Sequence, residues 1–419
     1  MSAPDITPAE VEAVLAVLRT PSLSLGPRLA AFEQALAART GARHAVGVSS
    51  GTAGLHLCVI AAGVGEGDLV ITTPFSFVAS ANCVLYERGI PVLVDVDPAT
   101  GNIDPALVAE AAHDLARGGP AGRRWLPPAL RITQHATGTA SHRSRITHHA
   151  SRLKSLLPVH AFGQPADMEP IVETAREHGL FVVEDACEAI GAEYKGRPAG
   201  TLGDAGVFAF YPNKQMTAGE GGAIVTGHDE WEGLLRSLRN QGRDVFDAWL
   251  CHARLGYNYR LDEMSAALGL TQLSRLEELL ARRERVAGWY NVRLRGVEGV
   301  ELPHIAPTTT RMSWFVYVIR LTAGIDRRAV MQALEAEGIP SRPYFTPIHL
   351  QPFYVERFGY RRGDYPVAED LGERSLALPF SGVMSEAQVD RVCARLARVV
   401  EGELAREPGL PLASRGLRA

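Results

Sequence analysis

The stretch DMEPIVETAREHGLFVVED, residues 167–185, decides the fold class. Residues 167–178 carry apolar side chains at helical spacing, which predicts a helix. After Gly179, the apolar run over 180–185 predicts a buried strand that ends in two acidic residues. A helix that leads directly into such a strand is typical of a parallel sheet with helices on both faces.

The same alternation continues in both directions from this unit. Short apolar runs predict strands over residues 45–48, 69–72, 91–96, 156–159, 206–210 and 222–225. Helical patterns lie over residues 28–40, 77–88 and 104–116, and in a run that ends near residue 62. The sequence therefore predicts an α/β fold with a mostly parallel sheet. Ligands of such sheets bind at the carboxyl ends of the strands.

The C-terminal part has a different pattern. It contains a long helical stretch, one predicted strand and two further helices, over residues 262–294, 313–321, 326–338 and 385–402. We expect a large domain over residues 1–255, and a long connecting helix with a small α+β domain over residues 256–419. The last fifteen or so residues are rich in Pro, Gly and Arg, which predicts a frayed terminus.

A basic insertion interrupts the large domain at residues 117–152. Residues 115–166 hold eight Arg or Lys and no Asp or Glu, so the net charge of −4 divides into +8 here and −12 elsewhere. Basic stretches can bind nucleic acid. Here Gly, Pro, Ser and Thr predominate without hydrophobic periodicity, which favours a flexible surface segment and no nucleic-acid role. Its four histidines show no helical pairing, so no metal site is expected.

Composition excludes several protein classes. No apolar run in the 419 residues reaches the length of a membrane-spanning helix, and the N-terminus lacks the pattern of a signal peptide. The five cysteines are scattered without a CxxC pair, which argues against a disulfide scaffold or a zinc site. We therefore expect a cytoplasmic protein without a membrane partner.

Lysine is rare in this chain. The 43 basic residues comprise 40 arginines and only Lys154, Lys195 and Lys214. Lys154 lies in the basic insertion and Lys195 in a turn sequence. Lys214 lies between an apolar strand and a glycine-rich turn, where a partly desolvated amine favours imine formation. A solvated loop lysine is the competing interpretation.

Two further motifs carry chemistry. Asp185 ends a strong apolar strand, and a carboxylate there can keep the nitrogen of a pyridine cofactor protonated. The residues Ser50, Gly51, Thr52 and Ala53 stand between a strand and a helix, where free backbone N–H groups and hydroxyls suit a phosphate. Each motif has an ordinary alternative, since Asp, Ser and Thr also cap helices.

Taken together, these motifs resemble the sugar aminotransferases of the DegT/DnrJ/EryC1/StrS family, within the fold type I enzymes that use pyridoxal phosphate. The resemblance runs from about residue 25 to residue 397. It is carried by SGTA (50–53), GVGEGDLVITTPFSFVASAN (63–82), PVLVDVDPATGNID (91–104), LPVHAFGQPADM (157–168), VVEDACEAIGA (182–192), FYPNKQMTAGEGG (210–222) and LGYNYRLDEMSAALGLTQL (255–273).

The resemblance implies a role for each matching residue. Lys214 is the Schiff-base lysine and proton carrier, and Asp185 pairs with the pyridine nitrogen. The other implied cofactor contacts are Gly51, Thr52, the stacking aromatic Phe77, Glu188, and Asn258 from the neighbouring subunit of a homodimer. Substrate roles are suggested for His349, Tyr344 and Arg243. The cofactor would alternate between pyridoxal phosphate and pyridoxamine phosphate.

The resemblance also implies a reaction. An amino acid, L-glutamate by family habit, would donate its amino group to a nucleotide-linked keto sugar. Glu188 resembles the branch that aminates 4-keto-6-deoxy sugars, such as perosamine synthases. Alternatives are a cyclitol (inosose) aminotransferase, an aminohydroxybenzoate synthase, or a non-catalytic regulatory protein that binds pyridoxal phosphate. One departure is Ala209, where relatives carry a serine that binds phosphate, and it predicts weaker cofactor retention.

Overall fold

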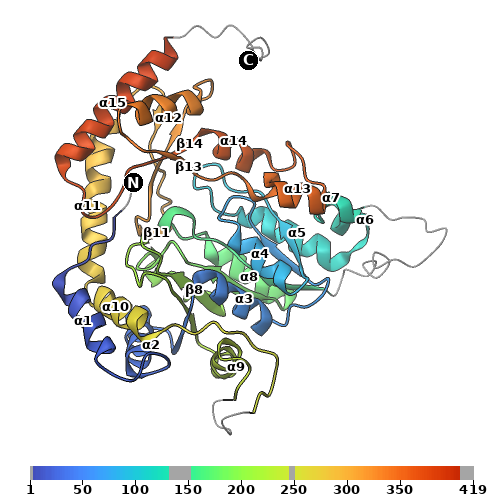
Figure 1. Cartoon of the computed structure of the whole chain (residues 1–419). Coiled ribbons are helices and arrows are strands. Elements are labelled where there is room, and N and C mark those ends of the chain that lie inside the picture. The colour runs from blue at the N-terminus through green and yellow to red at the C-terminus, as the bar shows by residue number, and fades with distance from the viewer. Residues whose placement is uncertain (1–2, 132–151, 245–250, 406–419) are drawn as a thin grey trace, which may run out of the picture.

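The computed structural model describes residues 3–131, 152–244 and 251–405 (Figure 1). At its centre lies a seven-stranded sheet in the order β1-β9-β8-β5-β4-β2-β3. The bounds are β1 His44–Val48, β9 Gly222–Thr226, β8 Ala205–Ala209, β5 Phe181–Asp185, β4 Leu153–Leu156, β2 Leu69–Thr72 and β3 Ile90–Leu93. Only β9 runs antiparallel to its neighbours, which confirms the predicted α/β fold with a mostly parallel sheet.

Helices cover both faces of this sheet because its strands are apolar on both sides. One face packs against α3 (Gly51–Ala61), α4 (Ala79–Tyr86) and α9 (Asp229–Arg239). The other packs against α5 (Pro105–Arg117) and α8 (Met168–His178) at one end, and α2 (Pro27–Thr40) and α10 (Glu263–Ser274) at the other. This arrangement leaves the carboxyl ends of β5 and β8 side by side, since these strands are parallel neighbours.

A second sheet forms the C-terminal part of the chain. Its antiparallel order is β10-β12-β14-β13, with bounds β10 Val300–Glu301, β12 Tyr317–Leu321, β14 Ser375–Leu378 and β13 Arg342–Pro343. The long helices α11 (Leu276–Leu294) and α15 (Glu386–Leu404) and the shorter α12 (Arg327–Ala336) enclose an apolar core with it. The predicted division at residues 255 and 256 stays a prediction.

Smaller elements connect the two parts. Strand β11 (Thr309–Arg311) pairs with the hairpin of β6 (Glu193–Tyr194) and β7 (Arg197–Pro198). Helices α13 (Pro352–Phe358) and α14 (Pro366–Arg374) share a core with Phe75 and Leu93 of the large sheet region. Helix α1 (Pro8–Leu18) packs on α10.

No helix in the described ranges is long and apolar enough to cross a membrane.

Several predicted elements differ from the structure, among them the strands at 91–96 and 313–321, which are observed as Ile90–Leu93 and Tyr317–Leu321. Strand β4 lies at 153–156 and not at 156–159, because Leu153–Leu156 pairs with β2 and β5. The long helical stretch is broken at Arg275, which takes non-helical angles between α10 and α11. Part of the insertion predicted to be flexible forms short helices, α6 (Gly119–Arg123) and α7 (Pro128–Arg131).

The part of the insertion that the structure describes is held by contacts with its surroundings. Leu126 is buried, and Arg124 pairs with Glu110 and Asp114 of α5. Residues 132–151, with the four histidines of the insertion, lie outside the described residues, as does most of the terminus predicted to be frayed.

Candidate functional site

Lys214 lies in the turn that follows β8. The turn is closed by a hydrogen bond of 2.9 Å from the Lys214 N–H to the Tyr211 carbonyl. Its side chain is 13% exposed, and Nζ lies 3.5 Å from Glu188 Oε1 and 3.9 Å from the ring centre of Phe315. A cation over an aromatic face is favourable. The amine is thus held between a carboxyl group and a ring.

Asp185 ends β5, the neighbour of β8 in the sheet. Its side chain accepts hydrogen bonds from Ser80 Oγ at 2.6 Å and from the Cys187 N–H at 3.2 Å. Its main chain is tied to Pro158 and His160, and the residue is 6% exposed. The carboxylate therefore has a defined direction at the same sheet edge as Lys214.

The N-terminus of α3 completes this edge. Ser50 caps the helix by accepting a hydrogen bond of 3.1 Å from the Ala53 N–H. A Cβ on Gly51 would lie 2.7 Å from Cys187 Sγ and 2.8 Å from the Cβ of Ala209, so only glycine allows this approach. The first N–H groups of a helix, here on Gly51 and Thr52, have no intrahelical partner and favour an anion.

Glu188 connects Lys214 to the chain beyond β4. Its Oε2 accepts a hydrogen bond of 2.9 Å from the Phe162 N–H. Burial raises the pKa of this carboxyl group above its usual range, while the nearby Lys214 opposes the shift. Glu188 can therefore keep a proton to higher pH than an exposed glutamate, directly beside an amine.

Phe77 and Tyr344 are the two aromatic residues that the sequence assigns to this site. Phe77 precedes α4, the helix that carries Ser80, and is 64% exposed. Tyr344 is half-buried with its ring 6.0 Å from that of Phe162, and burial together with the charge of Glu188 raises its pKa to about 12. Tyr344 is thus placed beside Phe162 and Glu188, and Phe77 is linked to the site through its backbone carbonyl, which accepts a hydrogen bond of 3.3 Å from Ser80 Oγ.

Three predicted residues are not brought to Lys214 within one subunit. Asn258 is exposed and forms a strand-like bridge with Asn240, and Arg243 lies in the loop after Asn240. His349 is fully buried, and its Nε2 lies 2.9 Å from Glu369 Oε1. Burial lowers the pKa of His349, and Glu369 opposes this shift. This enclosed pair stabilises the α13–α14 region, away from solvent.

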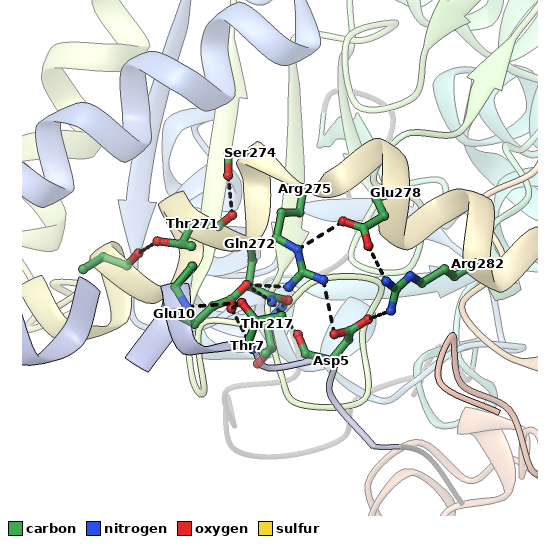
Figure 2. Close-up of polar contacts among 12 residues, drawn as sticks. Asp5, Thr7, Glu10, Thr217, Thr271, Gln272, Ser274, Arg275, Glu278 and Arg282 are labelled. Carbon is green, nitrogen blue, oxygen red and sulfur yellow. Dashed lines mark hydrogen bonds and ion pairs between the residues drawn. The ribbon is translucent and has the colours of Figure 1, made fainter. Parts of the chain in front are cut away.

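Thr217, three residues after Lys214, contacts the N-terminal clamp, which comprises Asp5, Glu10, Gln272, Arg275 and Arg282 (Figure 2). Gln272 accepts a hydrogen bond of 3.2 Å from the Thr217 N–H and donates to Asp5 O and Glu10 Oε1, both at 2.8 Å. Arg275 pairs with Glu10 at 2.8 Å and with Asp5 at 3.2 Å. The first residues of the chain are thereby linked to the segment that carries Lys214.

Sequence reasoning missed several residues of this site. Ser80 and Phe315 lie in segments predicted as an ordinary helix and strand, where a hydroxyl or a ring carries no visible signal. Arg283, described below, is one arginine among 40. No group of three or more His, Cys, Asp or Glu suited to a metal ion occurs within residues 3–131, 152–244 and 251–405.

Comparisons with known proteins cover nearly the whole chain. The model of the DegT/DnrJ/EryC1/StrS aminotransferase family matches residues 4–117 and 135–397. GDP-perosamine synthase of Caulobacter vibrioides is 39% identical over 96% of this chain and 98% of that protein. UDP-N-acetyl-3-dehydro-alpha-D-glucosamine 3-aminotransferase of Acidithiobacillus ferrooxidans is 36% identical over 92% of each. The crystal structure of DesV from S. venezuelae superposes with a TM-score of 0.79, at 33% identity over 94% of each chain.

Proposed function

This chain belongs to the DegT/DnrJ/EryC1/StrS aminotransferase family, and we propose that it moves an amino group from L-glutamate to a nucleotide-linked 4-keto-6-deoxy sugar. It is an aminotransferase that depends on pyridoxal phosphate, as its family and relatives are. The observation that carries the proposal is the Lys214 amine beside Glu188, at the sheet edge that also presents Asp185.

The residues present fit pyridoxal phosphate. Gly51 lets the start of α3 lie close to Ala209, and the first N–H groups of this helix favour an anion. The buried Asp185 has a fixed direction, and the Lys214 amine lies beside Glu188. When bound, the cofactor supplies an electrophilic aldehyde and a pyridine ring that withdraws electrons. Lys214 would hold it through the amine, Asp185 through the ring nitrogen, Gly51 and Thr52 through the phosphate, and the exposed ring of Phe77 by stacking.

The chain itself supplies proton transfer and orientation. Lys214 Nζ is the general base and acid that moves a proton at the substrate carbon, in both halves of the reaction. Glu188 lies 3.5 Å from this nitrogen and can exchange a hydrogen bond with it as the amine gains or loses a proton. Ser80 keeps the Asp185 carboxylate in place through its bond of 2.6 Å.

The sugar is proposed from two observations. The similarity to GDP-perosamine synthase extends over 96% of this chain. A glutamate at position 188 resembles the family branch that acts on 4-keto sugars, and this Glu188 contacts Lys214. The Acidithiobacillus relative is named for a 3-keto sugar, so both positions belong in the test. Cyclitol, aminohydroxybenzoate and regulatory roles have less support.

We also propose a homodimer with shared active sites. Asn258 is exposed on a segment that other residues hold firmly: Tyr257 and Tyr259 stack at 5.1 Å, and Tyr257 donates a hydrogen bond of 3.0 Å to Glu87. An exposed amide between two half-buried, stacked rings suits a contact with a second copy of the chain. There it would reach the phosphate of the neighbouring cofactor.

A substrate screen tests the proposed function. The holoenzyme, with L-glutamate, is offered nucleotide-linked 4-keto-6-deoxy sugars, 3-keto sugars and keto cyclitols, and each product is identified by mass. We expect amination of a GDP-linked 4-keto-6-deoxy sugar. Amination of only a 3-keto sugar or a cyclitol would contradict the proposed substrate while leaving the aminotransferase activity in place.

A further inference from the structure

Arg283 is a buried arginine in α11. It is 4% exposed, and burial alone lowers its pKa to about 10. Within the described ranges, no ion pair to Asp or Glu includes it, although the helix is rich in both signs of charge. An unpaired buried cation is costly unless hydrogen bonds satisfy it. The hydrogen-bond partners of Arg283 must therefore compensate for the burial of its charge.

Its guanidinium group donates hydrogen bonds to four backbone carbonyls in two separate segments. Nη2 donates to Lys214 O at 2.7 Å and to Asn213 O at 3.3 Å, in the turn after β8. Nη1 donates to Phe315 O at 3.1 Å and to Trp314 O at 3.4 Å, just before β12. Arginine can do this because its planar fork carries five donors in fixed directions, which a lysine does not offer.

The two segments meet again at the amine. Lys214 Nζ lies 3.9 Å from the centre of the Phe315 ring, so Arg283 fixes the backbones of both partners in this contact. Gln215 strengthens the same link, since its Nε2 donates to Ser313 O at 3.1 Å and to Ser313 Oγ at 2.9 Å. The turn after β8 and the segment just before β12 are therefore joined at Lys214 and its neighbour Gln215.

We propose that Arg283 is a positioning residue that sets the direction of the Lys214 amine by holding the Lys214 and Phe315 backbones at a fixed separation. This role rests on the proposed function, in which Lys214 holds the cofactor. Because the hydrogen bonds of Arg283 go to backbone carbonyls and its guanidinium group lies over the Phe380 ring, it acts through geometry and exchanges no proton with substrate. Its loss should disturb the reaction step more than the binding of the sugar.

The test compares Arg283→Lys and Arg283→Ala with the matched control Arg285→Ala. Arg285 lies two residues further along α11 and is exposed. We expect kcat to fall about 100-fold in both Arg283 variants, the size of effect that a misplacement of about 1 Å produces, with little change in the KM for the sugar. The circular dichroism of the bound cofactor should weaken, because it reports the orientation of the group on Lys214. Guanidinium ion should partly restore Arg283→Ala, and ammonium ion should not.

The outcomes separate the two proposals. Arg283→Lys keeps the charge and most of the side-chain volume, so this variant still tests the proposal if Arg283→Ala does not fold. Wild-type kcat and cofactor dichroism in Arg283→Lys would overturn the positioning role alone. A wild-type protein that shows no cofactor band after addition of pyridoxal phosphate would overturn the proposed function, and the role of Arg283 with it.

Discussion

At the scale of single residues, Ala209 bears on how tightly the proposed cofactor is held. It is the last residue of β8, and its Cβ lies 2.8 Å from the point that a Gly51 Cβ would occupy. A hydroxyl added here would lie at the N-terminus of α3, beside the proposed phosphate position. Ala209→Ser should therefore tighten binding of pyridoxal phosphate by about tenfold, the value of one hydrogen bond to a charged group.

The measurement is a titration of the apoprotein with pyridoxal phosphate, followed by absorbance. Ala209→Gly is the control, since it changes the same position without adding a hydroxyl. An unchanged dissociation constant for Ala209→Ser would show that the position does not face the phosphate.

The sequence predicts those candidate-site residues that combine a reactive side chain or a free N–H group with a clear strand end. Lys214, Asp185 and the Gly51 turn stand at strand ends next to glycine or acidic residues, and the structure places all three at one sheet edge. Phe315 and Arg283 could not be found in this way, because their roles depend on contacts between segments about 70 and 100 residues apart from Lys214 in the chain. His349 was expected near substrate, but its ring is enclosed with Glu369.

At the scale of elements, the N-terminal clamp makes a prediction about pH. Burial disfavours the charged form of Glu10, but hydrogen bonds from Thr7, Arg275 and Gln272 outweigh burial and lower its pKa to about 2. A carboxyl group with a lowered pKa stabilises the folded state above its unfolded value of 4.5, and this contribution is lost as the pH falls from 4.5 towards 2. At neutral pH the contribution is about 3 kcal/mol.

Glu10→Gln should consequently lower the stability of the protein most at neutral pH. Urea denaturation of the wild-type and variant proteins at pH 7 and at pH 3 measures the difference, with an exposed glutamate of α1, Glu12→Gln, as control. The gap between wild type and Glu10→Gln should shrink at the lower pH, because below pH 4.5 the unfolded wild type takes up a proton that the folded protein does not, which reduces the stabilisation. A gap of equal size at both pH values would rule out the ionised Glu10 as its source.

The elements predicted well are those with strong local signals. The strand at 69–72 matches β2, and the helix at 167–178 matches α8 within one residue. The break at Arg275 was not predictable, because it is stabilised by Asp5 and Glu10 from the start of the chain. Strand β4 was misplaced because the apolar run continues past its end, into Leu157 and Val159, which are buried without belonging to the strand.

At the scale of the whole molecule, the proposed homodimer with shared active sites predicts complementation between two inactive subunits. A hybrid of one Lys214→Ala subunit and one Asn258→Ala subunit keeps one site with both residues intact if Asn258 acts on the neighbouring site. Such a hybrid should show about half of the wild-type activity per dimer at limiting cofactor, since one of two equivalent sites is complete. Each homodimeric variant should be much less active than the hybrid.

The hybrid is purified with two different affinity tags and compared with a mixture of the two homodimers. A hybrid no more active than that mixture would place Asn258 in its own subunit's site, and it would remove the argument for shared sites.

The central claim is that Lys214 lets this chain transfer an amino group to a sugar. It is tested most directly with L-glutamate whose amino group carries heavy nitrogen, a GDP-linked 4-keto-6-deoxy sugar and the holoenzyme. We predict that the heavy nitrogen appears in the nucleotide sugar, as seen by mass, with the wild-type protein and with neither Lys214→Ala nor Lys214→Arg. Transfer of the label by either variant at the wild-type rate, or no transfer by the wild type to any keto sugar, would contradict the account.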